Sequence, residues 1–212
     1  MKIGVLGSGD VAQTLAAGLI KHGHQVMVGT RDAAKLEKWR QANAKAQVGS
    51  TKDAAAFGEA VLLAVKGSVA ADVLRAASAG IDGKLVMDAC NPIADAAPVN
   101  GVLKFFTTLD DSLMERLQRE FPKAHLVKVF NSVGAPRMVN PQYKAGKPTM
   151  FICGNDDSSK VVVAQILEQF GWETADMGKA EAARAIEPLC MLWCILGFTK
   201  NEWTHAFKLL RE

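Results

Sequence analysis

The first twenty residues place a glycine-containing turn between an apolar segment and an amphipathic one. Lys2–Leu6 is a short apolar run typical of a buried β-strand, and residues 11–21 repeat apolar side chains at helical spacing. The turn between them reads GSGDVA and fits the pattern G-x-G-x-x-A. Gly7 permits a tight turn, Gly9 lets the backbone approach a pyrophosphate, and Ala12 allows the helix to pack closely on the strand. A chain that begins in this way is expected to fold as a strand–helix unit whose free helix N–H groups face an anionic ligand.

Strand and helix patterns continue to alternate along the whole chain. Strands are expected at residues 25–28, 60–65, 84–88, 126–130, 149–153 and 172–175. Helices are expected at residues 33–41, 68–79, 111–121, 158–170 and 180–196, the last interrupted near Pro188. Such alternation favours an α/β fold, specifically a Rossmann-type, doubly wound, mostly parallel sheet with a small C-terminal α/β extension. We predict a dinucleotide-binding domain at residues 1–147 and, at residues 148–212, a strand-helix-strand-helix extension that packs on the same sheet.

Composition limits the classes of partner. The 212 residues are 49% hydrophobic and 22% charged, with a formal net charge of +3 and no run of five or six like charges, so we expect no nucleic-acid partner. The N-terminus lacks the pattern of a signal peptide. The longest apolar stretch, residues 189–198, is shorter than the ~20 residues that span a bilayer. We therefore expect a cytoplasmic protein without a membrane segment.

The cysteines do not form a metal-binding pattern. Cys190 and Cys194 lie one helical turn apart in apolar surroundings, Cys90 and Cys153 are isolated, and the four histidines are scattered. A metal site needs several ligands close together. We expect buried free thiols and no metal, with a redox or metal role as the alternative.

The tip of the second expected strand lacks the acidic residue that would bind the two ribose hydroxyls of NAD. It reads Gly29-Thr30-Arg31, followed by Asp32 and, one turn into the next helix, by Lys35. A guanidinium can pair with a phosphate through two parallel hydrogen bonds. We interpret Asp32 as a helix cap and predict that NADP(H) is preferred over NAD(H). The alternative is that these charges simply face solvent.

With these residues in view, the chain resembles the NADP oxidoreductase family that depends on the deazaflavin coenzyme F420. The resemblance covers most of the chain and is also seen with the cytosolic reductase domains of six-transmembrane metalloreductases. It is carried by GSGDVAQTLA, VGTRDAAKLE, DACNP, KVFNSVGAPRMVNP, PTMFICGNDD and the C-terminal EPL.

The resemblance implies a set of site residues, grouped by the part of the ligand that each would contact. The pyrophosphate loop would be formed by Gly7, Ser8, Gly9, Asp10 and Val11, and the clamp on the 2′-phosphate by Thr30, Arg31 and Lys35. The third crossing, at the end of the strand expected at residues 60–65, would be lined by Ala64, Val65 and Lys66. The nicotinamide ribose would lie near Asn91 and Pro92, and the nicotinamide and acceptor ring would be bordered by Asn131, Ser132, Val133 and Gly134.

Two features depart from the family pattern. Archaeal members often carry a His where Asn131 stands, and the aromatic residues Trp193, Phe198 and Trp203 have no counterpart that we can map. The aromatic tail either walls an acceptor pocket, forms a contact in a homodimer, or packs as ordinary core.

The sequence shows no obvious catalytic dyad, which fits hydride transfer between two rings, since that reaction needs positioning more than acid or base. The preferred hypothesis is an NADPH-dependent oxidoreductase whose second substrate is coenzyme F420, FMN, FAD or a similar flavin-like acceptor. The alternatives are a reductase of a small carbonyl or imine substrate and a non-catalytic NADP(H)-binding redox sensor. Reductases of small substrates usually add a long helical domain, for which the 32 residues after Ala180 are too few unless a dimer supplies the rest.

Overall fold

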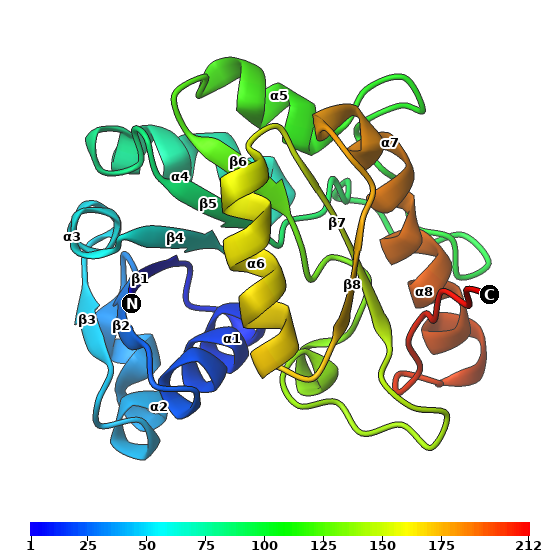
Figure 1. The fold of residues 1–212 in the computed structure, drawn as a ribbon, viewed down its shortest axis with the longest axis horizontal. Helices are drawn as coiled ribbons and strands as arrows, with labels where there is room; N and C mark the ends of the chain where they lie inside the picture. Colours follow the sequence, from blue (N-terminus) through cyan, green and yellow to red (C-terminus); the bar gives the residue numbers. More distant parts are fainter.

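The computed structural model describes residues 1–212, apart from the side chain of Ser78, as one eight-stranded sheet with helices on both faces (Figure 1). The strand order is β3-β2-β1-β4-β5-β6-β7-β8. Every neighbouring pair is parallel except β6 and β7, which run antiparallel. The strands are β1 Lys2–Leu6, β2 Gln25–Gly29, β3 Gln47–Gly49, β4 Ala60–Leu63, β5 Leu85–Asp88, β6 His125–Lys128, β7 Thr149–Gly154 and β8 Glu173–Asp176. The predicted Rossmann-type, mostly parallel sheet is confirmed.

Helices connect the strands. The α-helices are α1 Asp10–Lys21, α2 Glu37–Ala42, α3 Thr51–Phe57, α4 Ala70–Ala77, α5 Leu113–Glu120, α6 Asp157–Gln169, α7 Ala183–Ile186 and α8 Pro188–Lys200. Short 3₁₀ turns are η1 Ala33–Leu36, η2 Gly67–Val69, η3 Ser78–Gly80, η4 Ala135–Arg137 and η5 Ala180–Ala182.

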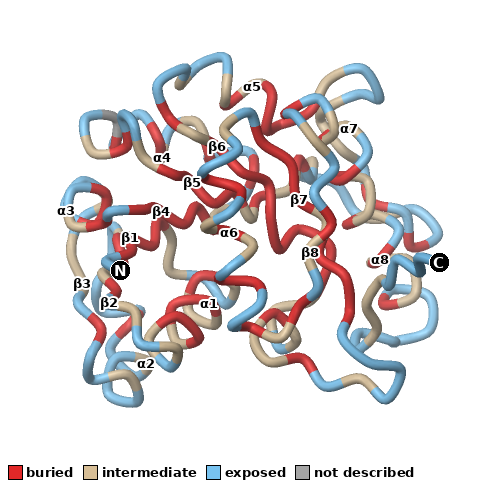
Figure 2. The backbone as a smooth tube through the Cα atoms, in the orientation of Figure 1, coloured by how far each residue is buried: buried red, intermediate tan, exposed pale blue. Residues whose placement is uncertain are grey.

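Two hydrophobic clusters fill the two faces of the sheet. Alternate residues of each strand point to opposite faces, so Ile3 and Val5 join one cluster while Leu6 joins the other. The first cluster packs under α1 and α6, and the second under α3, α4, α5 and α7. The central strands are buried along their whole length (Figure 2), which explains their continuous apolar sequences.

The structure differs from the sequence prediction between residues 33 and 58. The helix expected at 33–41 is the 3₁₀ turn η1 followed by the short helix α2, and β3 and α3 were not predicted. Strand β3 has only three residues, and its place at the sheet edge is set by pairing with β2. Helix α3 did carry a local signal, because Ser50 and Asp53 form a reciprocal capping box at its N-terminus.

The C-terminal segments continue the same sheet. β7 and β8 lie beyond β6, with α6 packed across them (Figure 1). The division at residue 147 stays a prediction. The final residues, 201–212, follow an irregular path that returns to β7, where the Thr149 N–H donates to the Phe207 carbonyl at 2.9 Å.

By length and composition alone, one helical segment, Ala180–Lys200, could cross a bilayer. Within the protein, 39% of its most apolar window is buried, and core helices of soluble proteins meet the same criterion. Glu187, in the first half of this segment, is 1% exposed and pairs with Lys128 of the sheet. The expectations of a cytoplasmic location and of no membrane segment stay predictions.

Helix α6 is capped at its N-terminus by the carboxylate of Asp156, so the stability of the fold should depend on pH at this position. Asp156 accepts hydrogen bonds from Ser158 Oγ at 2.6 Å and from the Ser159 N–H at 2.7 Å. These bonds lower the pKa of the Asp156 carboxyl from 3.8 to about 2. Because the folded-state pKa is depressed, the carboxylate contributes stability above about pH 4 and loses that contribution as the pH falls toward 2.

We therefore expect Asp156→Ala to destabilise the protein by about 1 kcal/mol at neutral pH. The difference from wild type should shrink as the pH falls from about 4 to 2, measured by thermal unfolding across that range. Asp156→Asn is the matched control, because Asn caps helices as well as Asp does but carries no charge. A difference between wild type and Asp156→Ala that is constant over this range would contradict the assignment.

Candidate functional site

The predicted site residues follow the carboxyl ends of five neighbouring parallel strands. β2, β1, β4, β5 and β6 run in the same direction, so the turns after them meet at one edge of the sheet. Ligands of open α/β sheets bind at this edge. The structure brings the predicted residues together here, in the order of the strands that carry them.

The turn after β1 is pressed against the end of β4. The Gly7 N–H donates to the Gly29 carbonyl of β2 at 3.1 Å. Gly7 has φ of 130°, and a Cβ there would lie 2.2 Å from the Ala64 carbonyl oxygen and 3.1 Å from Val65 Cγ1. Only glycine fits this turn, and the same contact places Ala64 and Val65 beside the loop.

Gly9 faces open space at the start of α1. A Cβ built there meets no atom of the described residues within 4 Å, and its backbone is extended, with φ of −80°. The structure itself does not require glycine here, whereas a ligand lying against the backbone would. Across the described chain, no side chain caps the N-terminus of this twelve-residue helix, so its first N–H groups remain available to an anion. The loop fits a pyrophosphate.

Polar contacts hold the rest of the loop. Gln13 Nε2 donates to the Ser8 carbonyl at 2.8 Å, and Thr30 Oγ1 lies 3.1 Å from Ser8 Oγ. These contacts join the loop to the tip of β2. Asp10 is exposed in the first turn of α1, and Val11 is half-buried.

The tip of β2 presents cationic side chains to solvent. Asp32 accepts a hydrogen bond from the Ala34 N–H at 3.1 Å, which confirms its predicted role as a cap. Lys35 Nζ lies 4.0 Å from Asp32 Oδ2, and the lysine side chain is 71% exposed. Arg31 is exposed and takes part in none of the ion pairs that the described residues form. A guanidinium so placed can pair with a phosphate without breaking an existing contact.

The turns after β5 and β6 are linked through two asparagines. Asn91 Nδ2 donates to the Asn131 carbonyl at 3.0 Å, and Asn131 Nδ2 donates to the Ile186 carbonyl at 2.8 Å. The Pro92 carbonyl accepts from the Phe106 N–H at 2.9 Å. The turns therefore hold each other and are joined to the C-terminal helices. Lys66, after β4, is exposed.

The loop at residues 131–134 lies under the C-terminal aromatic residues. Ser132 and Val133 are buried. A Cβ on Gly134 would lie 2.8 Å from Trp193 Cη2, so this position admits no larger side chain while Trp193 stays in place. Trp193 packs against Trp203, with ring centroids 5.5 Å apart, and stacks on His205 at 5.0 Å. The aromatic tail thus forms one wall of the loop.

A buried ion-pair network lies behind this loop, and sequence reasoning missed it. Lys128 Nζ lies 2.7 Å from Asp88 Oδ2 and 2.9 Å from Glu187 Oε1, and it donates to the Cys90 carbonyl at 2.9 Å. All three charged side chains are at most 2% exposed. Asp88 and Lys128 are register partners on β5 and β6, and Glu187 stands between α7 and α8.

Burial would lower the pKa of the Lys128 ammonium, but Asp88 and Glu187 raise it above its ordinary value. The lysine is therefore charged within the fold. A signal for this network was present in the sequence, because Asp88, Lys128 and Glu187 are the charged residues of DACNP, KVFNS and EPL, three segments already singled out. Nothing in their spacing indicated that they meet.

The thiols are free, as predicted: Cys90, Cys153 and Cys190 are buried, and Cys194 is half-buried. Burial raises the pKa of the Cys153 thiol to about 12 and that of Cys90 well above its usual range. These two thiols are therefore unreactive at neutral pH.

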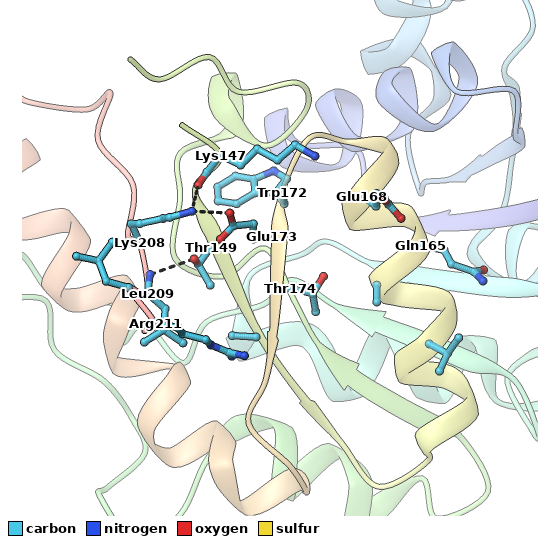
Figure 3. Close-up of a pocket in the computed structure, with 14 residues that line it drawn as sticks. Lys147, Thr149, Gln165, Glu168, Trp172, Glu173, Thr174, Lys208, Leu209 and Arg211 are labelled. Atoms are coloured by element: carbon cyan, nitrogen blue, oxygen red, sulfur yellow. Dashed lines mark hydrogen bonds and ion pairs between the residues drawn. The ribbon is translucent and has the colours of Figure 1, made fainter. Parts of the chain in front are cut away.

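A pocket of about 770 Å³ lies away from this edge cluster, between α6, β8 and the C-terminal tail (Figure 3). Lys208 Nζ lies 2.5 Å from Glu173 Oε1 and donates to the Lys147 carbonyl at 2.9 Å, and the Leu209 N–H donates to Thr149 Oγ1 at 3.0 Å (Figure 3). These contacts fasten the tail over the starts of β7 and β8.

The sheet order, the glycine turn on the first strand and the open N-terminus of α1 define a Rossmann-type dinucleotide-binding protein. Residues 2–92 match the model of the family described as NADP oxidoreductase, coenzyme F420-dependent. A crystal structure of a candidate F420-dependent NADP-reductase from Arthrobacter sp. FB24 superimposes with a TM-score of 0.93, at 32% identity and over 100% of both chains. The chain belongs to this family and is an NADP-dependent oxidoreductase.

Two curated relatives are similar in sequence to this chain over about nine tenths of its length. The F420-dependent NADP reductase of Methanocaldococcus jannaschii is 28% identical over 207 residues, which cover 91% of this chain and 90% of that one. The metalloreductase STEAP3 of Rattus norvegicus is 29% identical over 189 residues, or 89% of this chain. The matched region spans only 36% of the rat protein's length.

The buried network predicts a large stability effect from one substitution. We expect Lys128→Met to destabilise the protein by about 3–5 kcal/mol, because it leaves Asp88 and Glu187 buried without their shared cation. Urea denaturation of both proteins measures the difference. Lys123→Met is the control, since Lys123 pairs with Asp82 at 3.2 Å on the surface, where its side chain is 77% exposed, and the loss should be at most about 1 kcal/mol. Similar losses for the two variants would refute a structural role for the network.

Proposed function

We propose that this protein transfers a hydride between NADPH and a deazaflavin, coenzyme F420, or a flavin-like acceptor such as FMN or FAD. The observation that carries the proposal is the arrangement at one sheet edge. The partly exposed glycine loop at residues 7–11 lies toward one end of that edge. The buried loop at residues 131–134, which packs against Trp193, lies at the other end. The resemblance to archaeal F420-dependent NADP reductases over most of both chains supports the same acceptor class.

The adenosine half of the cofactor is proposed to bind at the turns after β1 and β2. Gly7, Ser8, Gly9, Asp10 and Val11 would hold the pyrophosphate, through backbone N–H groups and the open space beside Gly9. Thr30, Arg31 and Lys35 would hold the 2′-phosphate. Of these, Arg31 makes the largest contribution in this proposal, because Lys35 shares its charge with Asp32 and Thr30 is engaged with Ser8.

The nicotinamide half is proposed to lie along the turns after β4, β5 and β6. Ala64, Val65 and Lys66 would line the crossing from one half to the other, and Asn91 and Pro92 would border the ribose. Asn131, Ser132, Val133 and Gly134 would border the nicotinamide and the acceptor ring. When bound, NADPH supplies the hydride. The residues of the chain orient the two rings and exclude water.

Asn131 is proposed to orient rather than to exchange protons. Its Nδ2 group is already bonded to the Ile186 carbonyl, and an amide does not titrate near neutral pH. Trp193 is proposed to form a flat apolar wall of the acceptor pocket. In this proposal it shapes the pocket and takes no part in the chemistry.

Arg31→Ala tests the proposed clamp. Charge-assisted hydrogen bonds contribute about 1.5–3 kcal/mol, so we expect NADPH to bind roughly ten- to a hundred-fold more weakly, with NADH nearly unaffected. Titration calorimetry with both nucleotides measures the change. Arg119→Ala is the matched control, because it removes the same charge from an exposed position on α5. An equal loss for NADPH and NADH would refute the assignment.

A panel of acceptors tests the reaction. We expect NADPH oxidation, followed by the loss of its absorbance, to be fastest with the deazaflavin, slower with FMN or FAD, and slowest with small carbonyls and imines. Gly9→Val is the control, because its side chain would fill only the proposed cofactor space, and it should abolish turnover while the protein stays folded. Turnover with carbonyl or imine substrates alone would favour the small-substrate reductase. Tight NADPH binding with no turnover at all would favour the redox sensor.

A further inference from the structure

Phe130 has a backbone conformation that bulky residues seldom adopt. Its φ is 59°, in the left-handed region, and its side chain is 2% exposed. A non-glycine residue in this region persists only where the surrounding structure holds it, and such residues cluster at functional sites. Phe130 directly precedes the loop at residues 131–134. The turn after β6 is therefore strained where it begins to form the proposed nicotinamide site.

Both sides of Phe130 are fastened to the same short segment of the C-terminal helices. On the N-terminal side, Lys128 Nζ lies 2.9 Å from Glu187 Oε1. On the C-terminal side, Asn131 Nδ2 donates to the carbonyl of Ile186, the residue before Glu187, at 2.8 Å. Residues 128–131 are thus tied at both ends to residues 186–187.

Glu187 is itself held firmly. Its Oε2 accepts from the Leu113 N–H at 2.9 Å and its Oε1 accepts from the Met114 N–H at 3.0 Å, both at the N-terminus of α5. The carboxylate therefore receives only donors: two backbone N–H groups and the Lys128 ammonium. A carboxylate at a helix N-terminus is stabilised by the helix dipole as well.

We propose that Glu187 is a positioning residue, which together with the Ile186 carbonyl keeps Phe130 in its strained conformation and so holds the 131–134 loop in place for hydride transfer. The inference rests on the proposed function, because it takes this loop to border the nicotinamide. It assigns to the EPL segment a role at the site, although Glu187 itself stays buried behind it.

Glu187→Gln is the sharpest substitution. Gln has nearly the same shape, but its amide carries two donors and only one acceptor oxygen. At least one of the three donors around it would then face another donor, so the junction of α7 and α8 must shift. The Ile186 carbonyl would move with it, and Asn131 would lose its anchor. Phe130 is then expected to relax to an ordinary φ.

The chain offers a matched control. Glu115 of α5 also carries a nearly buried carboxylate, and it pairs with Arg184 of α7 at 2.6 Å. Like Glu187, this pair connects α5 to the C-terminal helices, but Glu115 forms no ion pair or hydrogen bond with Lys128 or Asn131. Glu115→Gln therefore weakens the packing of α5 on α7 without loosening the loop.

The test compares the two variants in kinetics, binding and structure. For Glu187→Gln we expect kcat for hydride transfer from NADPH to fall by about ten- to a hundred-fold, with a larger isotope effect from NADPH deuterated at C4. Binding of 2′,5′-ADP, which reports only the adenosine half, should change by less than about twofold. Glu115→Gln should change both quantities by less than about twofold. Ligand-free crystals of Glu187→Gln should show Phe130 outside the left-handed region.

Two results would overturn the proposal. One is an unchanged hydride-transfer rate in folded Glu187→Gln; the other is an equal loss of rate in Glu115→Gln. If Glu187→Gln does not fold, Asn131→Ala takes its place, because it removes the bond to Ile186 together with the longer 3.4 Å contact to Asn91 Oδ1. Its readout is the backbone, since Asn131 itself borders the proposed site: Phe130 should leave the left-handed region in ligand-free crystals while 2′,5′-ADP binding stays intact. If none of the acceptors supports NADPH oxidation by the wild type, the proposed function fails. The φ of Phe130 in ligand-free crystals of Glu187→Gln still decides whether Glu187 holds the loop.

Discussion

The ammonium of Lys128, enclosed between two carboxylates, is the constraint on which the rest of this structure depends. An unpaired charge at a site with no solvent exposure is strongly unfavourable, so Lys128 is tolerated only when Asp88 and Glu187 are both in place. Those partners come from a neighbouring strand and from the junction of two C-terminal helices. Meeting this one requirement therefore aligns β5 with β6 and fixes the helices over them. Because Glu187 also accepts from the first N–H groups of α5, a fifth element is positioned by the same group.

The network ties the C-terminal helices to the strands that border the proposed nicotinamide half of the site. The N-terminal strands supply the pyrophosphate loop and the β2 tip, whereas residues beyond Gly178 supply the aromatic wall and the anchor for Asn131. The nucleotide end is open and polar, as binding of a charged group requires. The other end is buried, carries a strained backbone at Phe130, and is covered by Trp193. This contrast fits an NADP-dependent oxidoreductase and our proposal that one end recognises the cofactor while the other orients the reacting rings.

The sequence predicted best those elements whose formation depends on residues close together in the chain. The alternation of apolar strands and amphipathic helices predicted the fold class and most elements, because strand and helix periodicity are read within a few residues. The cap at Asp32 was equally local. β3 was missed because its three residues become a strand only by pairing with β2. The short helix α3 was missed although its capping box, Ser50 with Asp53, stood in the sequence.

The sequence by itself determined the parallel α/β fold, the glycine turn with its open helix N-terminus, and the cationic tip of β2. Each of these follows from the residue types in one short segment: φ tolerance at Gly7, a missing side chain at Gly9, and a guanidinium at Arg31. Only the tertiary structure decided that Asp88, Lys128 and Glu187 share one buried charge network, that Asn131 is tied to Ile186, and that the aromatic tail covers Gly134. Through Lys128 the network joins Asp88 to Glu187, 99 positions further along the chain, and no periodicity or spacing carries information over such a separation. These contacts arise because the sheet brings distant strand ends to one edge. The charged side chains buried there are stable only when they are paired.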